Sequence, residues 1–504
     1  MQEYIVGLNK DVDYDAFWNE IQTTTNGLTY IPDRAVSVAN ERKGSQRLTH
    51  YTLSESEAEL LKNDPRVYCV EIPPSKRNDI SIGVMAVQSS NFTKNASNSS
   101  NDSNWGLVRS LSKNNNYGSS PSINDKYIYT LDGKGVDIVI QDSGIQSDHP
   151  EFSGRVQDID WYTASGISGT QNSNHNRDFF GHGTHVAGIA AGKHFGWGKR
   201  ANIYSQKIRG LEGNGDENTG IPVEDAFDCI RLWHASKNGN KPTVVNMSWG
   251  YYSQITPNSI NYRGSNYTSD WENYGVIENN GNYRIPVRVD SVDIEIQEMI
   301  DAGIHIVTSA GNDYTKIDIP GGNDYNNYVS SSLGNAFFYH RGGSPYDDEA
   351  ISVGNLYSAS YDENTDQKAL SSNCGPGVDL YAPGTKILSA VSTVYGMTSY
   401  STGSYFDDNN YKQMTLSGTS MAAPQVTGFL SLLLQINPTA SPQEVKKSLL
   451  NNCGSALHST NQDNDFTNHI SIKGSEKRIL FNKFGQVENP AEFNLPINAN
   501  IFVK

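Results

Sequence analysis

Short apolar segments alternate with longer helical segments through the middle of the chain, and this alternation restricts the possible folds most. The expected strands span residues 135–141, 203–208, 243–247 and 304–308, and the expected helices span residues 183–192, 223–236, 292–302 and 419–435. Strands that are apolar along their whole length are typical of a parallel sheet covered by helices on both faces. The sequence therefore predicts an α/β fold with such a sheet.

Polar residues follow three of the expected strands. Asp142, Ser248 and Asn312 each come directly after, or a few residues after, an apolar segment. Active sites of parallel sheets lie at the carboxyl ends of the strands. We therefore expect these three residues to lie together at one edge of the sheet.

An acid, a base and a nucleophile occur in that order, each among small residues. Asp142 lies in Val-Ile-Gln-Asp-Ser-Gly, His182 in Gly-His-Gly-Thr-His, and Ser420 in Gly-Thr-Ser-Met-Ala-Ala-Pro. A serine hydroxyl is a weak nucleophile, so it needs a histidine that takes its proton and a carboxylate that orients the imidazole. At the start of a helix, Ser420 would also lie where a developing oxyanion is favoured. The motifs therefore predict nucleophilic hydrolysis.

These motifs and their order resemble those of the subtilisin-like serine proteases, the subtilase family. The resemblance covers residues 2–73 and roughly 104–455, and the loop pattern is most similar to that of proteinase K-like members. It implies a subtilisin-like α/β fold and a serine endopeptidase that is made as a self-processing zymogen. It further implies that Asn312 binds the oxyanion and that the substrate lies along the segments Ser248-Trp249-Gly250 and Ser309-Ala310-Gly311.

Three residues bear on how far this resemblance extends. Trp249 stands where the family usually has a leucine that lines the specificity pockets, which puts the shape of those pockets in doubt. Gln425 replaces the histidine that usually follows Pro424, and we expect this change to affect packing more than chemistry. Pro424 itself is expected to be tolerated, because the first helical positions have no intrahelical partner for their N–H groups.

Two other functions remain open at this point. His182 and His185 are three residues apart and could bind a metal, as in a metallohydrolase, although no glutamate lies between them as in His-Glu-x-x-His. By the resemblance, His185 is instead a buried structural residue. The second alternative is a catalytically silent binding or structural protein on a protease scaffold.

Residues 1–73 are expected to form a separate small domain. Strands are expected at residues 4–8, 35–40, 47–52 and 67–71 and helices at 14–21 and 54–61, the second with a capping box between Ser54 and Glu57. This β-α-β-β-α-β order suits a ferredoxin-like α+β fold, and it resembles the inhibitor-type propeptide of subtilases. The resemblance implies that the domain inhibits its own enzyme intramolecularly.

The remaining boundaries follow from composition. We expect a disordered linker with the processing site at 74–103, a catalytic domain at 104–457, and a C-terminal extension of unknown role at 458–504. Insertions at 251–285, 313–343 and 391–413 are rich in Tyr, Ser, Asn and Gly, which suits either recognition surfaces or hydrated loops.

The processing site is expected between residues 79 and 89. Residues 80–87 are the first apolar segment after the small domain, and their alternation suits an extended strand bound beside residues 248–250. We favour cleavage after Met85, with Ile82 in the distal apolar pocket. The alternative is a cut after Arg77 by another protease.

No cofactor is expected to be required for the chemistry, but a structural calcium ion stays open. Asp379 matches a position that binds calcium in proteinase K-like members, and it is our only metal candidate. The four cysteines, Cys69, Cys229, Cys374 and Cys453, are spaced singly, and we expect mostly free thiols.

The charge of the chain bears on its partners. A net charge of −16, from 39 basic and 55 acidic side chains, argues against a nucleic-acid or anionic-membrane partner. No apolar run reaches the ~20 residues that cross a bilayer, and residues 1–6 lack the features of a secretory signal. We expect a monomer that acts on protein or peptide substrates, and the family analogy suggests an extracellular or virion-associated location.

Overall fold

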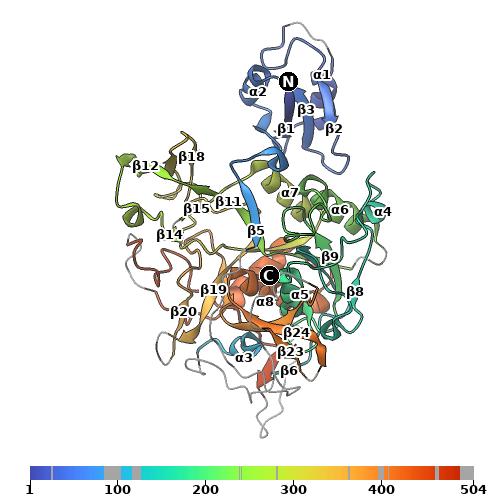
Figure 1. The fold of residues 1–504 in the computed structure, drawn as a ribbon, viewed down its shortest axis with the longest axis vertical. Coiled ribbons are helices and arrows are strands. Elements are labelled where there is room, and N and C mark those ends of the chain that lie inside the picture. Colours follow the sequence, from blue (N-terminus) through green and yellow to red (C-terminus); the bar gives the residue numbers. More distant parts are fainter. Residues whose placement is uncertain are drawn as a thin grey trace.

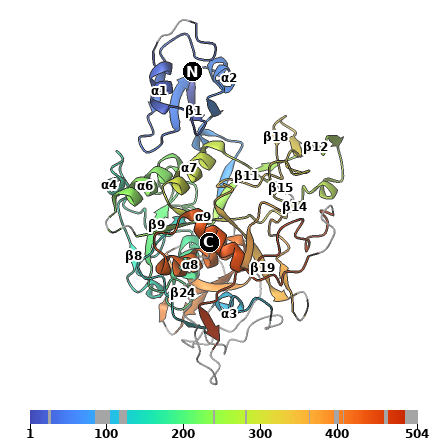
Figure 2. The same cartoon turned by 180° about the vertical axis from the view of Figure 1, so that it is seen from behind.

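The computed structural model describes residues 1–23, 27–84, 104–115, 127–237, 239, 241–279, 282–360, 362, 364–394, 402–406, 408–459 and 465–487. A small N-terminal unit stands on a larger body, and a short connection joins them (Figure 1). The view from behind shows the same two parts, with the small unit resting above the helices α6 (Val223–Ser236) and α7 (Asp290–Asp301) (Figure 2).

The body is built on an eight-stranded sheet with the order β20-β19-β16-β10-β7-β9-β8, in which β21 also pairs with β19. Its central strands are parallel: β7 (Asp137–Asp142), β9 (Asn202–Lys207), β10 (Thr243–Met247), β16 (His305–Ser309) and β19 (Ile351–Ser360). The outer members are β8 (Val156–Gln157), β20 (Asp366–Lys368) and β21 (Leu380–Pro383). The predicted α/β fold is confirmed.

Helices cover both faces of this sheet because its central strands are apolar on both sides. Val139 and Val245 pack in one cluster with α6 and α7. Their neighbours Ile138, Ile140 and Val244 pack on the opposite side, against α5 (His182–Ala191) and α8 (Thr419–Ile436). Successive side chains of a strand point to opposite faces, so the sheet is buried between two helical layers.

The N-terminal unit has the expected β-α-β-β-α-β order. Its antiparallel sheet runs β2 (Ser37–Asn40), β3 (Leu48–Leu53), β1 (Gln2–Leu8), β4 (Val67–Glu71), and its helices are α1 (Tyr14–Ile21) and α2 (Glu55–Lys62). The Ser54 and Glu57 capping box is present at the start of α2. Its apolar core includes Phe17, Ile21 and Leu61, so the unit has a core of its own.

The segment after this unit corrects one expectation. Residues 74–84 are not a disordered linker: they form a short 3-10 turn at Pro74–Lys76 and the strand β5 (Ser81–Val84). β5 is an edge strand of the sheet β14-β15-β11-β5, which also contains β11 (Trp249–Ile255), β14 (Glu278–Asn279) and β15 (Asn282–Pro286). Without β5, β11 would present an edge of unpaired backbone N–H and C=O groups. Pairing with that edge holds residues 81–84 as a strand. Residues 85–103, including Met85, lie outside the described residues.

Strands account for much of the described parts of the three insertions. The first two share a sheet of β13 (Ser265–Tyr267), β12 (Pro257–Tyr262), β17 (Tyr328–Ser331) and β18 (Ala336–Phe337). The third contributes β23 (Gly403–Tyr405) and part of β24 (Asp408–Leu416), which pairs with β22 (Ile387–Val391). Backbone pairing therefore holds these described parts of the insertions in place.

The described part of the C-terminal stretch packs onto the body. Phe466, Ile472, Ile479 and Leu480 are buried, and β25 (Gly485–Val487) pairs with β6 (Tyr127–Tyr129). The predicted boundary at residue 457 therefore does not divide the structure, because apolar residues beyond it belong to the same core. The remaining helices of the body include α3 (Trp105–Arg109), α4 (Trp161–Ser165) and α9 (Pro442–Asn452).

All four cysteines are free thiols, as expected. Among the described residues, no helix is long and apolar enough to cross a membrane.

Candidate active site

The structure brings the three motifs together at the expected edge of the sheet. Asp142 is the last residue of β7, His182 begins α5, and Ser420 is the second residue of α8. All three are fully buried. His182 Nδ1 lies 2.8 Å from Asp142 Oδ1, which also accepts a hydrogen bond from the backbone N–H of Ser143 at 2.7 Å. The carboxylate is thus held against the imidazole.

The nucleophile has a different partner in this structure. Ser420 Oγ donates to the carbonyl of Ser248 at 3.0 Å, while His182 Nε2 has no hydrogen-bond partner among the described residues. A rotation about the Ser420 Cα–Cβ bond would move the hydroxyl away from the carbonyl of Ser248. Catalytic hydrogen bonds commonly tighten only once the reacting substrate is in place.

Asn312 lies beside the start of the nucleophile helix. Its Oδ1 accepts hydrogen bonds from Thr419, at 3.1 Å from the backbone N and 3.3 Å from Oγ1. These bonds fix the orientation of the amide group. The Nδ2 group is the donor of that side chain, and the two bonds place the amide beside Thr419, the residue before Ser420.

The segment Ser248-Trp249-Gly250 runs into β11, next to the strand β5. Ser248 Oγ accepts from Asn246 Nδ2 at 2.8 Å and donates to the Ser420 carbonyl at 3.0 Å. Trp249 is buried in the apolar cluster beneath α6, with Phe227 and Tyr251 as ring neighbours. The indole is therefore part of the apolar core beside β11.

The bond from Ser248 to the Ser420 carbonyl also corrects our account of Pro424. Pro424 is the sixth residue of α8, beyond the first turn in which N–H groups lack partners. Its missing N–H would have bonded to the carbonyl of Ser420, four residues earlier. Ser248 Oγ donates to that carbonyl instead. The proline thus leaves the Ser420 carbonyl available to bond with the residue that precedes β11.

The second predicted substrate segment, Ser309-Ala310-Gly311, connects β16 to Asn312. The Ala310 N–H donates to the carbonyl of Val353 at 3.0 Å, and the Gly311 N–H donates to Thr419 Oγ1 at 3.2 Å. These bonds fix the segment against the neighbouring strand and the nucleophile helix.

Asp178 is a site residue that sequence reasoning missed. Its Oδ1 accepts from Ser143 Oγ at 2.9 Å and from the Gly181 N–H at 2.7 Å, and its Oδ2 accepts from the Thr184 N–H at 2.8 Å. Burial raises the pKa of Asp178, and these hydrogen bonds oppose that shift. Asp178 ties the residue after Asp142 to the start of the His182 helix. An aspartate shortly before a helix start is a recognisable signal.

The two histidines of the predicted motif have separate partners. His185 Nε2 lies 3.0 Å from the carbonyl of Met414, whereas the ring of His182 is paired with Asp142. Burial lowers the pKa of His185 to about 3, so this ring is neutral. In the described part of the chain, no group of three His, Cys, Asp or Glu side chains is arranged to hold a metal.

Gln425 lies in a buried polar cluster away from the triad. Its Oε1 accepts from Trp197 Nε1 at 2.6 Å and from Asn104 Nδ2 at 3.1 Å, and its Nε2 donates to the carbonyl of Pro383 at 3.1 Å. These contacts join α8 to the start of α3, so this glutamine has a packing role.

Asp379, our calcium candidate, is paired with a lysine. Its carboxylate oxygens each lie 2.9 Å from Lys446 Nζ, on α9. The expected calcium ligand is therefore already neutralised by a cation of the chain.

Comparison with known proteins places this chain in a family. The model of the subtilase family matches residues 133–479, and the chain therefore belongs to this family of serine proteases. It is 29% identical to the extracellular serine proteinase of Thermus sp. (strain Rt41A) over 398 residues, which cover 79% of this chain and 68% of that one. It is 28% identical to the subtilisin-like serine protease Pen c 2 of Penicillium citrinum over 363 residues, covering 69% of this chain and 60% of that one.

The fold has a counterpart among solved structures. Fervidolysin from Fervidobacterium pennivorans, described as a keratinolytic enzyme related to subtilisin, aligns with a TM-score of 0.50 and 19% identity. The alignment covers 94% of this chain and 60% of fervidolysin. At this identity the likeness shows the fold alone.

Proposed function

We propose that this chain is an endopeptidase that hydrolyses peptide bonds through Asp142, His182 and Ser420. His182 takes the proton of Ser420 as the hydroxyl attacks the carbonyl carbon, and Asp142 stabilises the imidazolium that forms. Asn312 and the Ser420 N–H donate to the oxyanion. His182 then gives the proton to the leaving amine, which leaves an acyl-enzyme on Ser420. In the second half of the reaction His182 takes a proton from the attacking water and returns it to Ser420 Oγ as the ester bond breaks.

The pairing of β5 with β11 is the observation that carries this proposal. Val84 lies opposite Trp249, Gly83 opposite Gly250, and Ile82 opposite Tyr251. An extended segment of the chain therefore lies along the strand that leads to Ser248, whose carbonyl contacts the nucleophile. Substrates of many proteins bind in this way, as an added strand.

The same register supports self-processing after Met85. Val84, the last described residue of β5, lies opposite Trp249, one residue from Ser248, and Met85 itself lies outside the described residues. Ile82 packs against the apolar cluster below β11. A Cβ on Gly210 would lie 2.3 Å from Ile82 Cγ2, so the absence of a side chain at Gly210 makes room for Ile82. This supports Ile82 as the occupant of the distal pocket.

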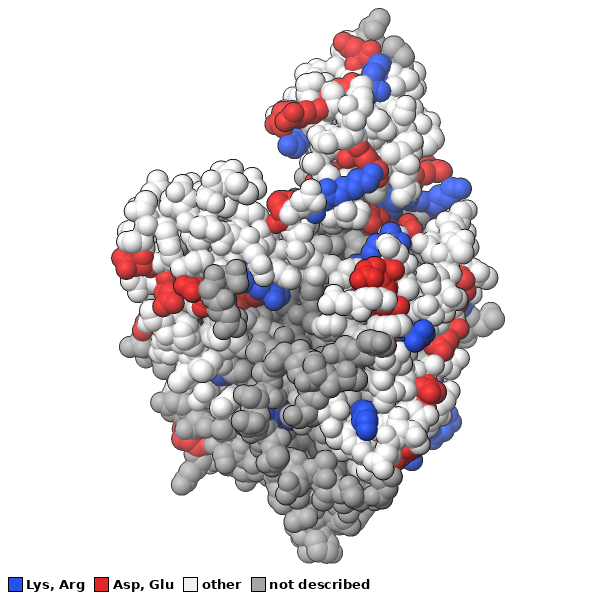
Figure 3. Space-filling model, in the orientation of Figure 1, with Lys and Arg blue, Asp and Glu red and all other residues white. Residues whose placement is uncertain are grey.

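We further propose that residues 1–73 are the inhibitory prodomain of this enzyme. Charged side chains gather where this unit meets the body (Figure 3). Arg42 is buried there between Asp228 and Glu295, with its Nε 3.2 Å from Asp228 Oδ2. Arg231 lies beside them and donates to the carbonyl of Gly44 at 2.7 Å. These contacts hold the unit on α6 and α7 while β5 occupies the substrate strand position.

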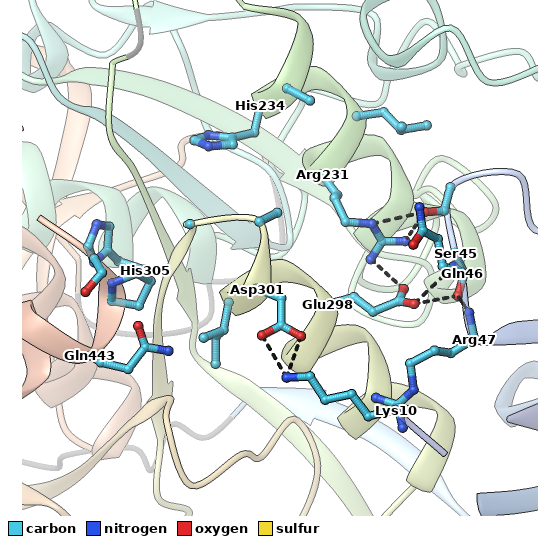
Figure 4. Close-up of a pocket in the computed structure, with 18 of the residues that line it drawn as sticks. Lys10, Ser45, Gln46, Arg47, Arg231, His234, Glu298, Asp301, His305 and Gln443 are labelled. Atoms are coloured by element: carbon cyan, nitrogen blue, oxygen red, sulfur yellow. Dashed lines mark hydrogen bonds and ion pairs between the residues drawn. The ribbon is translucent and has the colours of Figure 1, made fainter. Parts of the chain in front are cut away.

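A groove of about 1410 Å³, lined by both charged and apolar residues, runs along the same junction. Lys10 reaches Asp301 across it, and Glu298 lies between Arg231 and the loop of Ser45 and Gln46 (Figure 4). A junction of charged groups around a groove suits a partner that is released after cleavage, because water can enter it readily.

Replacement of Ser420 tests the mechanism and the zymogen together. The parent chain should yield a mature protein that starts at Ala86, and purified Ser420→Ala should remain an uncleaved 504-residue chain. A fluorophosphonate probe should label the parent at Ser420, which a catalytically silent scaffold would not do. Asp142→Asn should lower turnover by about 10⁴-fold.

Two results would contradict parts of this proposal. A mature protein that starts at Asn78 would indicate a cut after Arg77 by another protease, and continued cleavage of purified Ser420→Ala would exclude self-processing. We also propose that the enzyme acts outside the cell as a monomer, since a relative is named as extracellular. Mass spectrometry of the mature protein in its native source would test that location.

A further inference from the structure

Lys446 of α9 holds together three segments that are distant in the sequence. Its Nζ lies 2.9 Å from each carboxylate oxygen of Asp379. It also donates to the carbonyl of Asp348 at 2.8 Å and to that of Ala350 at 2.6 Å. Asp379 directly precedes β21, and Ala350 directly precedes β19. One ammonium thus joins the beginnings of two paired strands to a helix.

The surroundings of Lys446 Nζ are those expected of a bound cation. One carboxylate offers both oxygens, and two backbone carbonyls offer one oxygen each. Carboxylates and backbone carbonyls are the ligands that Ca²⁺ prefers in proteins, at about 2.3–2.6 Å. The ammonium occupies the point on which these four oxygens converge, and only slight contraction would bring them to calcium distances.

Asp379 as it stands does not fit a calcium ion. The ammonium and a calcium ion would compete for the same oxygens, and two cations so close together repel strongly. Both side chains are mostly buried, with exposed fractions of 14% for Lys446 and 18% for Asp379. Little solvent is therefore available to weaken that repulsion.

We propose that Lys446 replaces a structural cation, and that removal of its ammonium group turns the oxygen cage around Asp379 into a calcium site. The carboxylate keeps an anchor in that case, because Asp379 Oδ2 also accepts from the Ser352 N–H at 2.9 Å. A covalently supplied cation makes the junction of β19, β21 and α9 independent of free calcium. This inference concerns stability and does not rest on the proposed catalytic function.

Lys368 provides a matched control within the same body. Its Nζ donates to the carbonyls of Ala369, Leu370 and Ser372, at 2.8, 3.0 and 3.0 Å. It is almost fully buried, but none of these three contacts is with a carboxylate. Loss of its ammonium should destabilise the protein without creating a site that attracts calcium.

The experiment compares variants in a Ser420→Ala background, which prevents self-digestion. Thermal unfolding of Lys446→Ala, Lys446→Met, Lys446→Ala/Asp379→Asn and Lys368→Ala is measured in EDTA and in about 10 mM CaCl₂, well above the weaker calcium affinities of protein sites. Binding of Tb³⁺, a luminescent stand-in for Ca²⁺, is measured directly on the same proteins.

We expect Lys446→Ala to unfold at a lower temperature in EDTA and to regain several degrees in calcium, beyond any change of the parent. Asp379→Asn should abolish that regain, and Lys368→Ala should show none. Tb³⁺ should bind the Lys446→Ala chain at a site that the parent lacks. The proposal is overturned if calcium stabilises neither Lys446→Ala nor Lys446→Met, including the case in which both fail to fold. It is equally overturned if the parent, with Lys446 intact, binds Tb³⁺ and the single substitution Asp379→Asn in that parent removes the binding.

Discussion

The N-terminal unit and the segment that follows it meet the body in two contacts of different chemistry. Along β11, the strand β5 offers mainly backbone groups, which any extended peptide also has. On α6 and α7, Arg42 and the loop at Gly44 offer charged and closely fitted groups that an ordinary substrate lacks. Any extended peptide could therefore make the contact along β11, whereas the contact on α6 and α7 requires a partner that carries these charged and fitted groups. The role that we propose, an inhibitor that is also the first substrate, would need both contacts.

The contact on the helices depends on fit as well as charge. A Cβ on Gly44 would lie 2.6 Å from the Asp228 carboxylate, so a side chain there would separate the two surfaces. Burial disfavours the charge of Arg42, but Glu295 and Asp228 outweigh burial and hold the pKa of Arg42 above its ordinary value. Arg42 is therefore charged in the contact, and its loss would leave buried carboxylates with fewer partners.

The largest effect is expected from breaking the strand contact. Ile82→Asp would place a carboxylate in the apolar surroundings of Ile82. Ile82 is partly buried against this apolar cluster, and because an unpaired charge in such surroundings costs several kcal/mol, we expect self-processing to slow by about 10³-fold or more. Ile82→Leu is the control and should process at nearly the parent rate. Equal rates for Ile82→Asp and the parent, measured by the loss of full-length chain, would remove β5 from the processing pathway.

The next effect is expected from Arg42→Met, which breaks the helix contact and spares the strand. Removal of one member of a buried ion pair costs about 3–5 kcal/mol, so the unit should open about 10²- to 4 × 10³-fold more often. The measurement is the rate at which an added protease removes residues 1–73 from the uncleaved Ser420→Ala chain. A rate unchanged by Arg42→Met would show that the strand contact alone holds the unit.

A smaller, pH-dependent effect is expected at Glu71. Its Oε1 accepts from the Ser291 N–H at 2.8 Å, and burial raises the pKa of Glu71 from 4.5 to about 7. The docked unit thus favours the protonated carboxyl. The contribution of protonated Glu71 to the stability of the docked unit is fully present below pH 4.5, and it is lost as the pH rises through its docked pKa of about 7. Docking should therefore weaken by about tenfold or more between pH 5 and 8.

Glu71→Gln isolates this effect from the other carboxylates of the interface. Glutamine keeps the oxygen that accepts from Ser291 but does not ionise. Hydrogen exchange of the N-terminal unit should therefore show that the difference between parent and variant is small near pH 5 and grows toward pH 8. A constant difference across this range would mean that Glu71 does not change its protonation on docking.

Local patterns in the sequence predicted the framework of the site well. The helix 223–236 and the strand 243–247 have the predicted bounds, since each is set by its own apolar periodicity. Asp142, His182 and Ser420 converge because each follows a strand or begins a helix at the same edge of the sheet. Asp178 also had a local signal, just before the helix that it anchors.

Pairings between distant charged residues had no such signal. Arg42 is 186 residues from Asp228, and Lys446 is 67 residues from Asp379. Each of these side chains is ordinary in its local sequence, and only the packing of separate elements makes it a buried ion pair. The pairing of Asp379, the calcium candidate, with Lys446 could not be found for the same reason.

The smallest effect is expected at the exposed edge of the helix contact. Lys10 pairs with Asp301 at 2.9 Å, but their side chains are 64% and 48% exposed. Exposed ion pairs contribute about 0–1 kcal/mol, so Lys10→Ala should change the rate of protease removal by less than about fivefold. Added salt should reduce even this difference, because it screens exposed charges. Lys10→Ala and Arg42→Met thus remove one cation each from the same junction, the first exposed and paired with one carboxylate, the second buried between two. If both loosened the unit equally, charge alone would hold it, and the depth at which Arg42 is buried would be irrelevant.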